Sequence, residues 1–374
     1  MMGLAPALAE SPIGISSEVE NGWTSNATDS AAGAADFFTT HRHEMSVTGQ
    51  SDTVLLRGSL VISQTRFLQT TFKDDASVTG GVETEFALGP NMLLRLGYGV
   101  TRSWTGDDLA LGSVVLPLES EDTEHEFLAE VVVIGADQQV VLGVDGDWLE
   151  QGDTIIGGLD LPPLRLKPHV ALLTARVAWE RAFSPAMAVL AGMEGWLTRI
   201  PEADQLLYLR PAADGGRARL GLRLQRDQFA VEGFGGVDAI WPQGMQEMTE
   251  LAPHLALAAS LKPAASLRLT AAAETGVELA DPVDNVAGRT ASAELGARWD
   301  VTPAWALSVE LAGRRESGIY DDSLVRSRQV AALTARFTAS EKHAYAATLS
   351  LSHHENPGES YDKAGIALTL SGRL

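Results

Sequence analysis

The amino-acid sequence predicts an all-β protein, a transmembrane antiparallel up-and-down β-barrel with one face toward lipid and the other toward water. Apolar and polar side chains alternate through residues 363–374, where Ala364, Ile366, Leu368 and Leu370 share one face of a predicted strand. The same pattern recurs in residues 290–299, 305–314, 329–337 and 345–354. About eighteen such segments of about ten residues each occur along the chain, and no long amphipathic helix interrupts them.

Short turn signals alternate with longer polar segments, as expected for tight periplasmic turns and longer outer loops. The short turns lie at residues 49–52, 88–91, 135–138, 183–186, 225–228, 262–265, 300–304 and 338–343. The longer segments lie near residues 24–38, 68–75, 105–123, 150–166, 199–215, 242–249, 280–288, 316–326 and 355–360. Two strands separate successive turns, so the pattern predicts eighteen strands, with sixteen as the alternative if weak N-terminal segments are not strands. An even number of strands places both termini on the periplasmic side.

Composition narrows the class of protein. No run of about eighteen apolar residues is present, so a membrane-spanning helix is excluded. The mean hydropathy is close to zero, as expected when half of the strand residues face lipid and half face water. The absence of cysteine is compatible with an oxidising compartment, and the net charge of −21 argues against nucleic acid as a partner. No lapse in the alternation marks a linker, so residues 10–374 are predicted to form one barrel domain.

The N-terminus has the pattern of a secretory signal cleavage site. Ala7, Leu8 and Ala9 stand before Glu10 as a small-x-small motif. The residues before this motif are too few for an apolar core and include no basic residue. We interpret residues 1–9 as the remnant of a signal peptide whose beginning is missing. The alternative is an ordinary alanine-rich terminus.

Aromatic residues form two groups at opposite strand ends, as expected for the two membrane–water interfaces. On the face predicted to contact lipid, one group lies near the short turns: Trp179, Trp299, Trp305, Phe337 and Tyr345. The other group, at the opposite strand ends, contains Trp104, Trp148 and Trp241. Trp196 is predicted to point inward. A soluble sandwich buries tryptophan in mid-strand, so this distribution favours a membrane barrel.

The first predicted strand ends in Gly22-Trp23-Thr24-Ser25-Asn26, which resembles an aromatic-Asp-Ser-Asn stretch with Thr24 in place of Asp. The whole chain resembles Gram-negative outer-membrane β-barrel proteins. Its length is similar to that of a group of beta-barrel porins, some of which accompany exopolysaccharide secretion. The resemblance implies an integral outer-membrane location, contact with outer-membrane lipid and lipopolysaccharide, and insertion by the barrel-assembly machinery. The chain ends in Leu374, where many such barrels carry an aromatic residue.

A barrel of this size is too wide for side chains alone to fill, so its inner face is predicted to line a wet lumen. The predicted pore-lining residues are Arg95, Arg223, Arg268, Arg298, Arg336 and Arg373 near the periplasmic strand ends, with Glu126, Glu130, Glu194, Glu274, Glu294 and Glu310. In one interpretation, Arg and Glu pair across neighbouring strands and stiffen the wall. In the other, the arginines form a basic ring that attracts anions at the periplasmic mouth.

The third long segment, residues 105–123, is the candidate constriction loop, because it follows the strand after which general porins fold a loop into the barrel. Its middle is apolar, and acidic residues flank it: Asp107, Asp108, Glu119, Glu121 and Asp122. The alternative is an extracellular hairpin that extends the two strands above the membrane.

Signals for catalysis are poor, and neither an enzyme activity, a metal site nor a cofactor is predicted. His41 and His43 share a strand face without a third ligand in the neighbouring sequence, so pore lining is the favoured role. Ser352 and His354 could begin a hydrolytic set, but neighbouring polar residues are routine on a strand. The Asp145-Gly146-Asp147 stretch lies within a predicted strand and does not form a calcium loop.

These observations predict an outer-membrane channel for small polar or charged solutes. One alternative is an export pore for a secreted polysaccharide that works with separate periplasmic partners. Another is a structural or adhesion barrel whose lumen is closed by its loops, and an outer-membrane hydrolase has the least support. The sequence identifies no subunit interface, so the oligomeric state is open.

Overall fold

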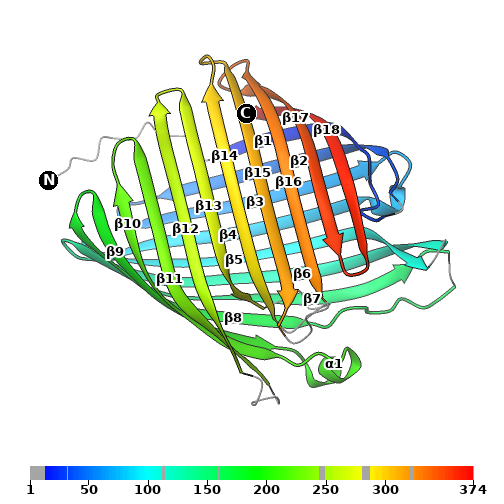
Figure 1. Ribbon diagram of the computed structural model, residues 1–374, viewed down its shortest axis with the longest axis horizontal. Helices are drawn as coiled ribbons and strands as arrows, with labels where there is room; N and C mark the ends of the chain where they lie inside the picture. The colour runs from blue at the N-terminus through cyan, green and yellow to red at the C-terminus, as the bar shows by residue number, and fades with distance from the viewer. Residues whose placement is uncertain are drawn as a thin grey trace.

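A computed structural model shows one antiparallel sheet of eighteen strands closed into a barrel (Figure 1). It describes residues 13–31, 33–111, 114–158, 160–243, 249–279, 287–319 and 324–373. Each strand pairs with the strands before and after it in the chain, and β18 closes on β1 through pairs from Ser16–Arg373 to Thr24–Gly365. The predicted fold class and the count of eighteen strands are therefore confirmed. The predicted signal-peptide remnant lies outside the described residues.

The strands follow one another around the barrel in chain order. They are β1 (Ile13–Thr24), β2 (Asp36–Gln50), β3 (Val54–Phe67), β4 (Asp75–Gly89), β5 (Met92–Leu111), β6 (Val114–Ile134), β7 (Gln138–Ile156), β8 (Val170–Ser184), β9 (Met187–Arg199), β10 (Ala213–Gln225), β11 (Phe229–Pro242), β12 (Glu250–Ala264), β13 (Leu267–Glu278), β14 (Gly288–Asp300), β15 (Trp305–Gly318), β16 (Val325–Thr338), β17 (His343–Asn356) and β18 (Glu359–Arg373). A short 3-10 helix, η1 (Thr71–Lys73), and a short α-helix, α1 (Glu202–Leu207), lie in two of the connections.

Successive connections alternate between the two ends of the barrel, and the connections at one end are all short. The connections at residues 51–53, 90–91, 135–137, 185–186, 226–228, 265–266, 301–304 and 339–342 all fall where short turns are predicted. We call this end the short-turn end and the other the long-loop end. Both ends of the described chain lie at the short-turn end, away from α1 (Figure 1). Among the described residues, no helix is long and apolar enough to cross a membrane.

The two faces of the wall have different chemistry, because successive side chains of a strand point to opposite sides. On β10, Leu220, Leu222 and Leu224 are 68%, 57% and 45% exposed on the outer face. Arg219 and Arg223 alternate with them and point inward to carboxylates. Large apolar side chains are exposed in the same way on the outer face of strands all around the barrel.

The predicted interface aromatics lie on the outer face, and one group lies near the short-turn end. Trp305, Phe337 and Tyr345 form a row near the short-turn end, with ring centroids 4.9 Å and 6.4 Å apart. Trp179 and Trp299 lie toward the same end of their strands, and Trp241 lies at the long-loop end of β11. Trp104 and Trp148 are predicted at strand ends but lie near the middle of β5 and β7, because these strands continue beyond them toward the long-loop end. Trp196 points inward, where the Arg217 guanidinium lies 5.3 Å from its ring. The depth of these rings in a bilayer stays a prediction.

Two long loops lock together beside α1. Arg165, in the β7–β8 loop, pairs with Asp204 of α1, and the Tyr208 hydroxyl donates to the Arg165 carbonyl at 2.7 Å. The His169 amide donates to the same Asp204 carboxylate at 2.9 Å. The hydrogen bond to Tyr208 raises the pKa of Arg165, burial lowers it in part, and Asp204 raises it again, so the net shift is upward. The charge that joins the two loops is therefore permanent.

A matched pair of substitutions on β12 tests which face meets lipid. Leu257→Lys places a charge at the middle of the outer face and should destabilise the barrel by about 2–4 kcal/mol. Ala258→Lys, one residue further along, points into the lumen and should have little effect. Urea unfolding in lipid vesicles, followed by tryptophan fluorescence, measures both. Equal destabilisation by the two variants would contradict the assignment of the faces.

Candidate functional site

The arginines and glutamates predicted to line the pore all lie on the inner face of the barrel. Residues directly opposite each other in the ladder share a face, and Arg95 is opposite Glu130, whereas Arg268 is opposite Arg298. Their neighbours along the strand, such as Leu96, are exposed on the outer face. The contact of these charges with a permeating solute stays a prediction.

Between β4 and β8, the inner charges form a continuous chain of ion pairs. Arg95 lies 3.0 Å from Glu130 and 3.7 Å from Glu85, measured between guanidinium nitrogen and carboxylate oxygen. Arg176 lies 3.0 Å from the other oxygen of Glu130 and 3.5 Å from Asp145. The Glu130 side chain is only 9% exposed, so two guanidinium groups compensate its lost hydration. This geometry agrees with pairing that stiffens the wall.

Pairing continues from β8 to β11. Arg223 pairs with Glu180 and lies 3.8 Å from Glu232. Arg219 lies 3.1 Å from Glu194. Arg95 and Arg223 thus each have carboxylate partners, so two members of the predicted basic ring are locally neutralised.

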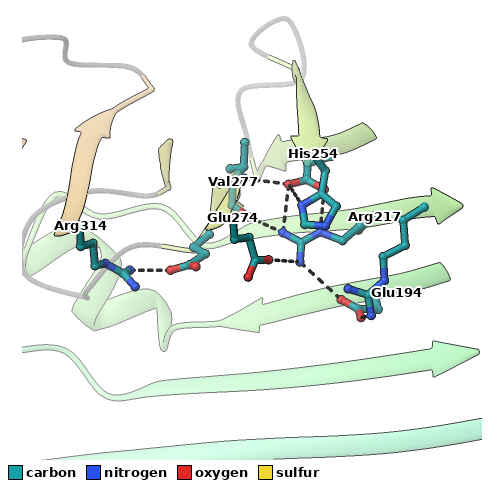
Figure 2. A network of polar contacts seen from close by, with 9 residues as sticks. Glu194, Arg217, His254, Glu274, Val277 and Arg314 are labelled. Atoms are coloured by element: carbon teal, nitrogen blue, oxygen red, sulfur yellow. Dashed lines mark hydrogen bonds and ion pairs between the residues drawn. The ribbon is translucent and has the colours of Figure 1, made fainter. Parts of the chain in front are cut away.

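The most buried polar cluster lies on β10–β13 near the long-loop end (Figure 2). Asp238 is fully buried and accepts two hydrogen bonds from Arg217, from Nε at 2.7 Å and from Nη2 at 3.0 Å. The other end of the Arg217 guanidinium lies 3.7 Å from Glu274 and 4.0 Å from Glu194. His254 is also fully buried, and neither of its ring nitrogens has a hydrogen-bond partner among the described residues. One arginine therefore joins carboxylates from three strands.

This cluster holds the end of β13 inside the lumen. Pairing between β12 and β13 ends at Leu255–Thr275, although β12 continues toward the long-loop end. The next residues of β13 cross the inner face of β12, because the Val277 amide donates to Asp238 of β11 at 2.7 Å. The Val277 carbonyl accepts from Arg217 at 3.3 Å. We call residues 276–278 the inward bend.

Small and apolar side chains complete the packing around the inward bend. Val277 is buried with Ala213, Ile240, Ala252 and Ala287 in one cluster. A Cβ atom on Gly276 would lie 2.6 Å from the Asp238 carboxylate and 2.9 Å from His254 Nδ1. Only glycine fits this position without displacing the cluster. The strand pattern alone did not predict the bend, and its one sequence signal is the glycine within β13.

The segment predicted as a constriction loop continues the strands instead. Asp107 pairs with Leu118 and Leu111 with Val114 in the β5–β6 ladder, so the backbone forms the extended hairpin of the two alternatives. Its acidic groups contact the protein near the hairpin. Asp107 binds Lys73 at 2.6 Å, Glu121 accepts from Trp104 at 3.0 Å, and Asp122 accepts from the Gly152 amide at 3.1 Å. Glu119 lies opposite Gly106, and Asp108 lies opposite Pro117. The inward-folded segment is on β13, not between β5 and β6.

The remaining basic residues concentrate on one side of the short-turn mouth. Arg268, Arg336 and Arg373, on β13, β16 and β18, have no hydrogen-bonded or ion-paired carboxylate in the part of the chain that the structure describes. Arg298 lies opposite Arg268 and is paired with Asp300 at 3.0 Å, where both side chains are about half exposed. The described residues also show no ion pair for Glu294 and Glu310. The basic charge forms a sector on β13–β18 rather than a ring.

An acidic patch faces the lumen on β6 and β7. Carboxylate oxygens of Glu124, Glu126 and Asp147 lie within 4.8 Å of one another. Glu126 and Asp147 are directly opposite in the ladder. The basic sector and this acidic patch lie on different parts of the wall, so the field inside the lumen is uneven.

The histidine and serine candidates have other positions. His41 and His43 face outward, since they lie opposite Val19 and Ser17 on the same face as the exposed Ile15, so the favoured pore-lining role is wrong. In β2, the alternation pattern assigns His41 and His43 to the outer face only if histidine is grouped with the apolar residues. Ser352 Oγ lies 2.9 Å from His354 Nε2. His354 stacks on Tyr361 and has no hydrogen-bonded carboxylate among the described residues, so the third member of a hydrolytic set is missing there.

Removing Arg217 tests the buried cluster. Arg217→Met leaves the Asp238 charge buried without a cation and should destabilise the barrel by about 3–5 kcal/mol. Arg217→Met combined with Asp238→Asn should recover part of this loss, because no buried charge is left unpaired. The matched control, Arg57→Met, removes an ion-paired arginine whose own side chain is 51% exposed and should cost less than about 1 kcal/mol. Urea unfolding in vesicles ranks the variants. A double variant less stable than Arg217→Met contradicts this account.

Shortening the β5–β6 hairpin tests its role in conduction. Residues 109–116 are replaced by Asn-Gly, which forms a tight hairpin turn between Asp108 and Pro117. Because the hairpin extends the wall, single-channel conductance should stay unchanged. A higher conductance in planar bilayers would show that this segment obstructs the lumen.

Comparisons with known proteins support the fold. No protein-family model matches the chain, and no curated protein matches it. Among solved structures, the copper transporter OprC aligns with a TM-score of 0.58 at 10% identity, covering 97% of this chain and 80% of that one. OccK1 (OpdK) of Pseudomonas aeruginosa aligns with a TM-score of 0.51 at 10% identity, covering 97% and 98%. The ferric enterobactin receptor PfeA of the same species, as a mutant, aligns with a TM-score of 0.53 at 8% identity, covering 96% and 80%. The chain therefore has the fold of outer-membrane β-barrels.

Proposed function

We propose that this chain is an outer-membrane channel through which small polar or charged solutes cross along the inner face of the barrel. The observation that carries the proposal is a closed wall of eighteen strands with an apolar outer face and a charged inner face. A barrel of this width is not filled by its own side chains. In a lipid-facing barrel, an interior lined by charge holds water.

The charge distribution favours anions at the short-turn mouth. Arg268, Arg336 and Arg373 lie near the short-turn ends of β13, β16 and β18, and none has a carboxylate partner among the described residues. Uncompensated guanidinium groups raise the local concentration of anions in a narrow aqueous space. We place this mouth on the periplasmic side, with both termini, because short turns face the periplasm in such barrels.

The comparisons support passage of small solutes. One similar structure is that of a copper transporter, and another is that of OpdK with vanillate, an organic anion. Both have TM-scores above 0.5 with this chain. For this chain, the inference is a solute channel without a named solute.

Reversal potentials in planar bilayers test the channel and its preference. The wild-type barrel should conduct in steps and prefer anions under a KCl gradient. Arg268→Gln, Arg336→Gln and Arg373→Gln together should move the reversal potential toward the cation side. The difference should shrink in about 1 M salt, where the screening length falls to about 3 Å.

The matched control changes the same charge elsewhere. Arg102, Arg181 and Arg315 lie on the outer face, so replacing these three by glutamine should leave the selectivity unchanged. Equal shifts in both triple variants would contradict a role for the basic sector. A folded barrel that never conducts would contradict the channel and favour a structural or adhesion role.

A further inference from the structure

The middle of the outer wall is apolar on β9–β12. The outward residues there are Ala191, Met193, Leu220, Leu222, Gly233, Gly235, Leu255 and Leu257. These residues suit contact with hydrocarbon. They are the reference with which the outer face of β1–β3 is compared.

On β1–β3, many of the same outer positions are polar, although Val19 and Ile62 among them are apolar. The outward residues Ser17 and Asn21 of β1, Thr39, His41 and His43 of β2, and Gln64 of β3 form what we call the polar stripe. His43 is the middle residue of β2 (Asp36–Gln50), and the polar stripe runs from there toward the long-loop end, where Thr39 is the fourth residue of the strand. Apolar residues on the same face continue toward the short-turn end: Ile13, Ile15, Met45 and Val47.

Hydrogen bonds within the polar stripe satisfy only part of it. Ser17 Oγ lies 3.0 Å from His43 Nδ1, and Thr39 Oγ1 donates to Asn21 Oδ1 at 2.9 Å. Among the described residues, the His41 ring and the Asn21 amide nitrogen have no hydrogen-bond partner, and both side chains are exposed. An unsatisfied polar group in hydrocarbon costs several kcal/mol. Contact of this face with lipid alone is therefore energetically unfavourable.

We propose that the polar stripe is the contact face for a second copy of this chain in the membrane. Serine, threonine, asparagine, glutamine and histidine side chains can each donate and accept hydrogen bonds, so the polar stripe is complementary to a copy of itself. At its edge, Arg66 lies opposite Thr39 on the same outer face and donates to the Gln64 side-chain oxygen at 3.1 Å. A two-fold axis along the membrane normal brings two such stripes face to face. The apolar residues beside them would pack as in other membrane interfaces.

Cysteine cross-linking tests the face directly, because the chain contains no cysteine. Val19 lies between Ser17 and Asn21 on the same face as the polar stripe, opposite His41, so Val19→Cys should form a disulfide-linked pair of chains in oxidised membranes. Leu222→Cys, on the outer face of β10, is the matched control and should remain a single chain. Equal cross-linking of the two variants, or a Val19→Cys product with a different protein, would overturn the proposal.

A second variant tests the hydrogen bonds themselves. His41→Leu with His43→Leu should convert the pair of chains to single barrels, measured by light scattering in mild detergent. His353→Leu, an outward histidine bound to Asp362 near the long-loop end of β17, should leave the pair intact. Native β-sheet circular dichroism shows that each variant has folded. A pair that persists in the double variant would overturn the role of the polar stripe, and cross-linking at Val19→Cys decides the matter if that variant does not fold.

Discussion

Closure of the sheet is the constraint on which the rest of the structure depends. Hydrocarbon offers no hydrogen bond to a backbone amide or carbonyl, so a strand edge cannot be left open in a membrane. The β1–β18 ladder, from Ser16–Arg373 to Thr24–Gly365, removes the two edges that a linear series of strands would leave. Once the wall is closed, each side chain of a strand points either outward, away from the barrel, or inward, into the lumen. The alternation of apolar and polar residues along each strand is the consequence, and so is the confinement of charge to the lumen and the rims.

The inner charges divide the lumen into two parts. From β4 to β11, arginine and carboxylate side chains interlock, as at Glu130, where two guanidinium groups hold one buried carboxylate. These pairs cross-link neighbouring strands, so this part of the wall is stiff, and its uncompensated charge is the acidic patch of Glu124, Glu126 and Asp147 on β6 and β7. From β13 to β18, many inward positions carry alanine, serine or threonine, and Arg268 and Arg336 remain without carboxylate partners among the described residues. Small side chains leave space there, and the uncompensated charge faces it.

The sequence was sufficient for the fold and for the face of most strands. Period-two alternation and turn residues predicted eighteen strands, the positions of the connections and the inward position of the arginines and glutamates proposed to line the pore, because each depends on local pattern. It was not sufficient where contacts depend on register across several strands. The partners of Arg95 and Arg217 follow from the stagger of the barrel, and the inward bend depends on β11, β12 and β13 together. His41 and His43 were misassigned for a different reason: their strand breaks the rule that outward residues are apolar.

The inward bend and the unpaired sector together restrict where a solute could pass. The bend brings the end of β13 across β12 at the long-loop side. The Asp238 carboxylate, which is fully buried and paired with Arg217, holds the bend there by accepting from the Val277 amide. A backbone held by an ion pair with a fully buried carboxylate does not move aside at low energetic cost, because separating the pair leaves the Asp238 charge uncompensated. For the proposed channel, this favours a route along the small inward side chains of β15–β18, such as Ala312 and Ser350. β16 and β18 also carry Arg336 and Arg373, nearer the short-turn end. A solute that follows the open side of the lumen would meet these charges rather than the interlocked wall.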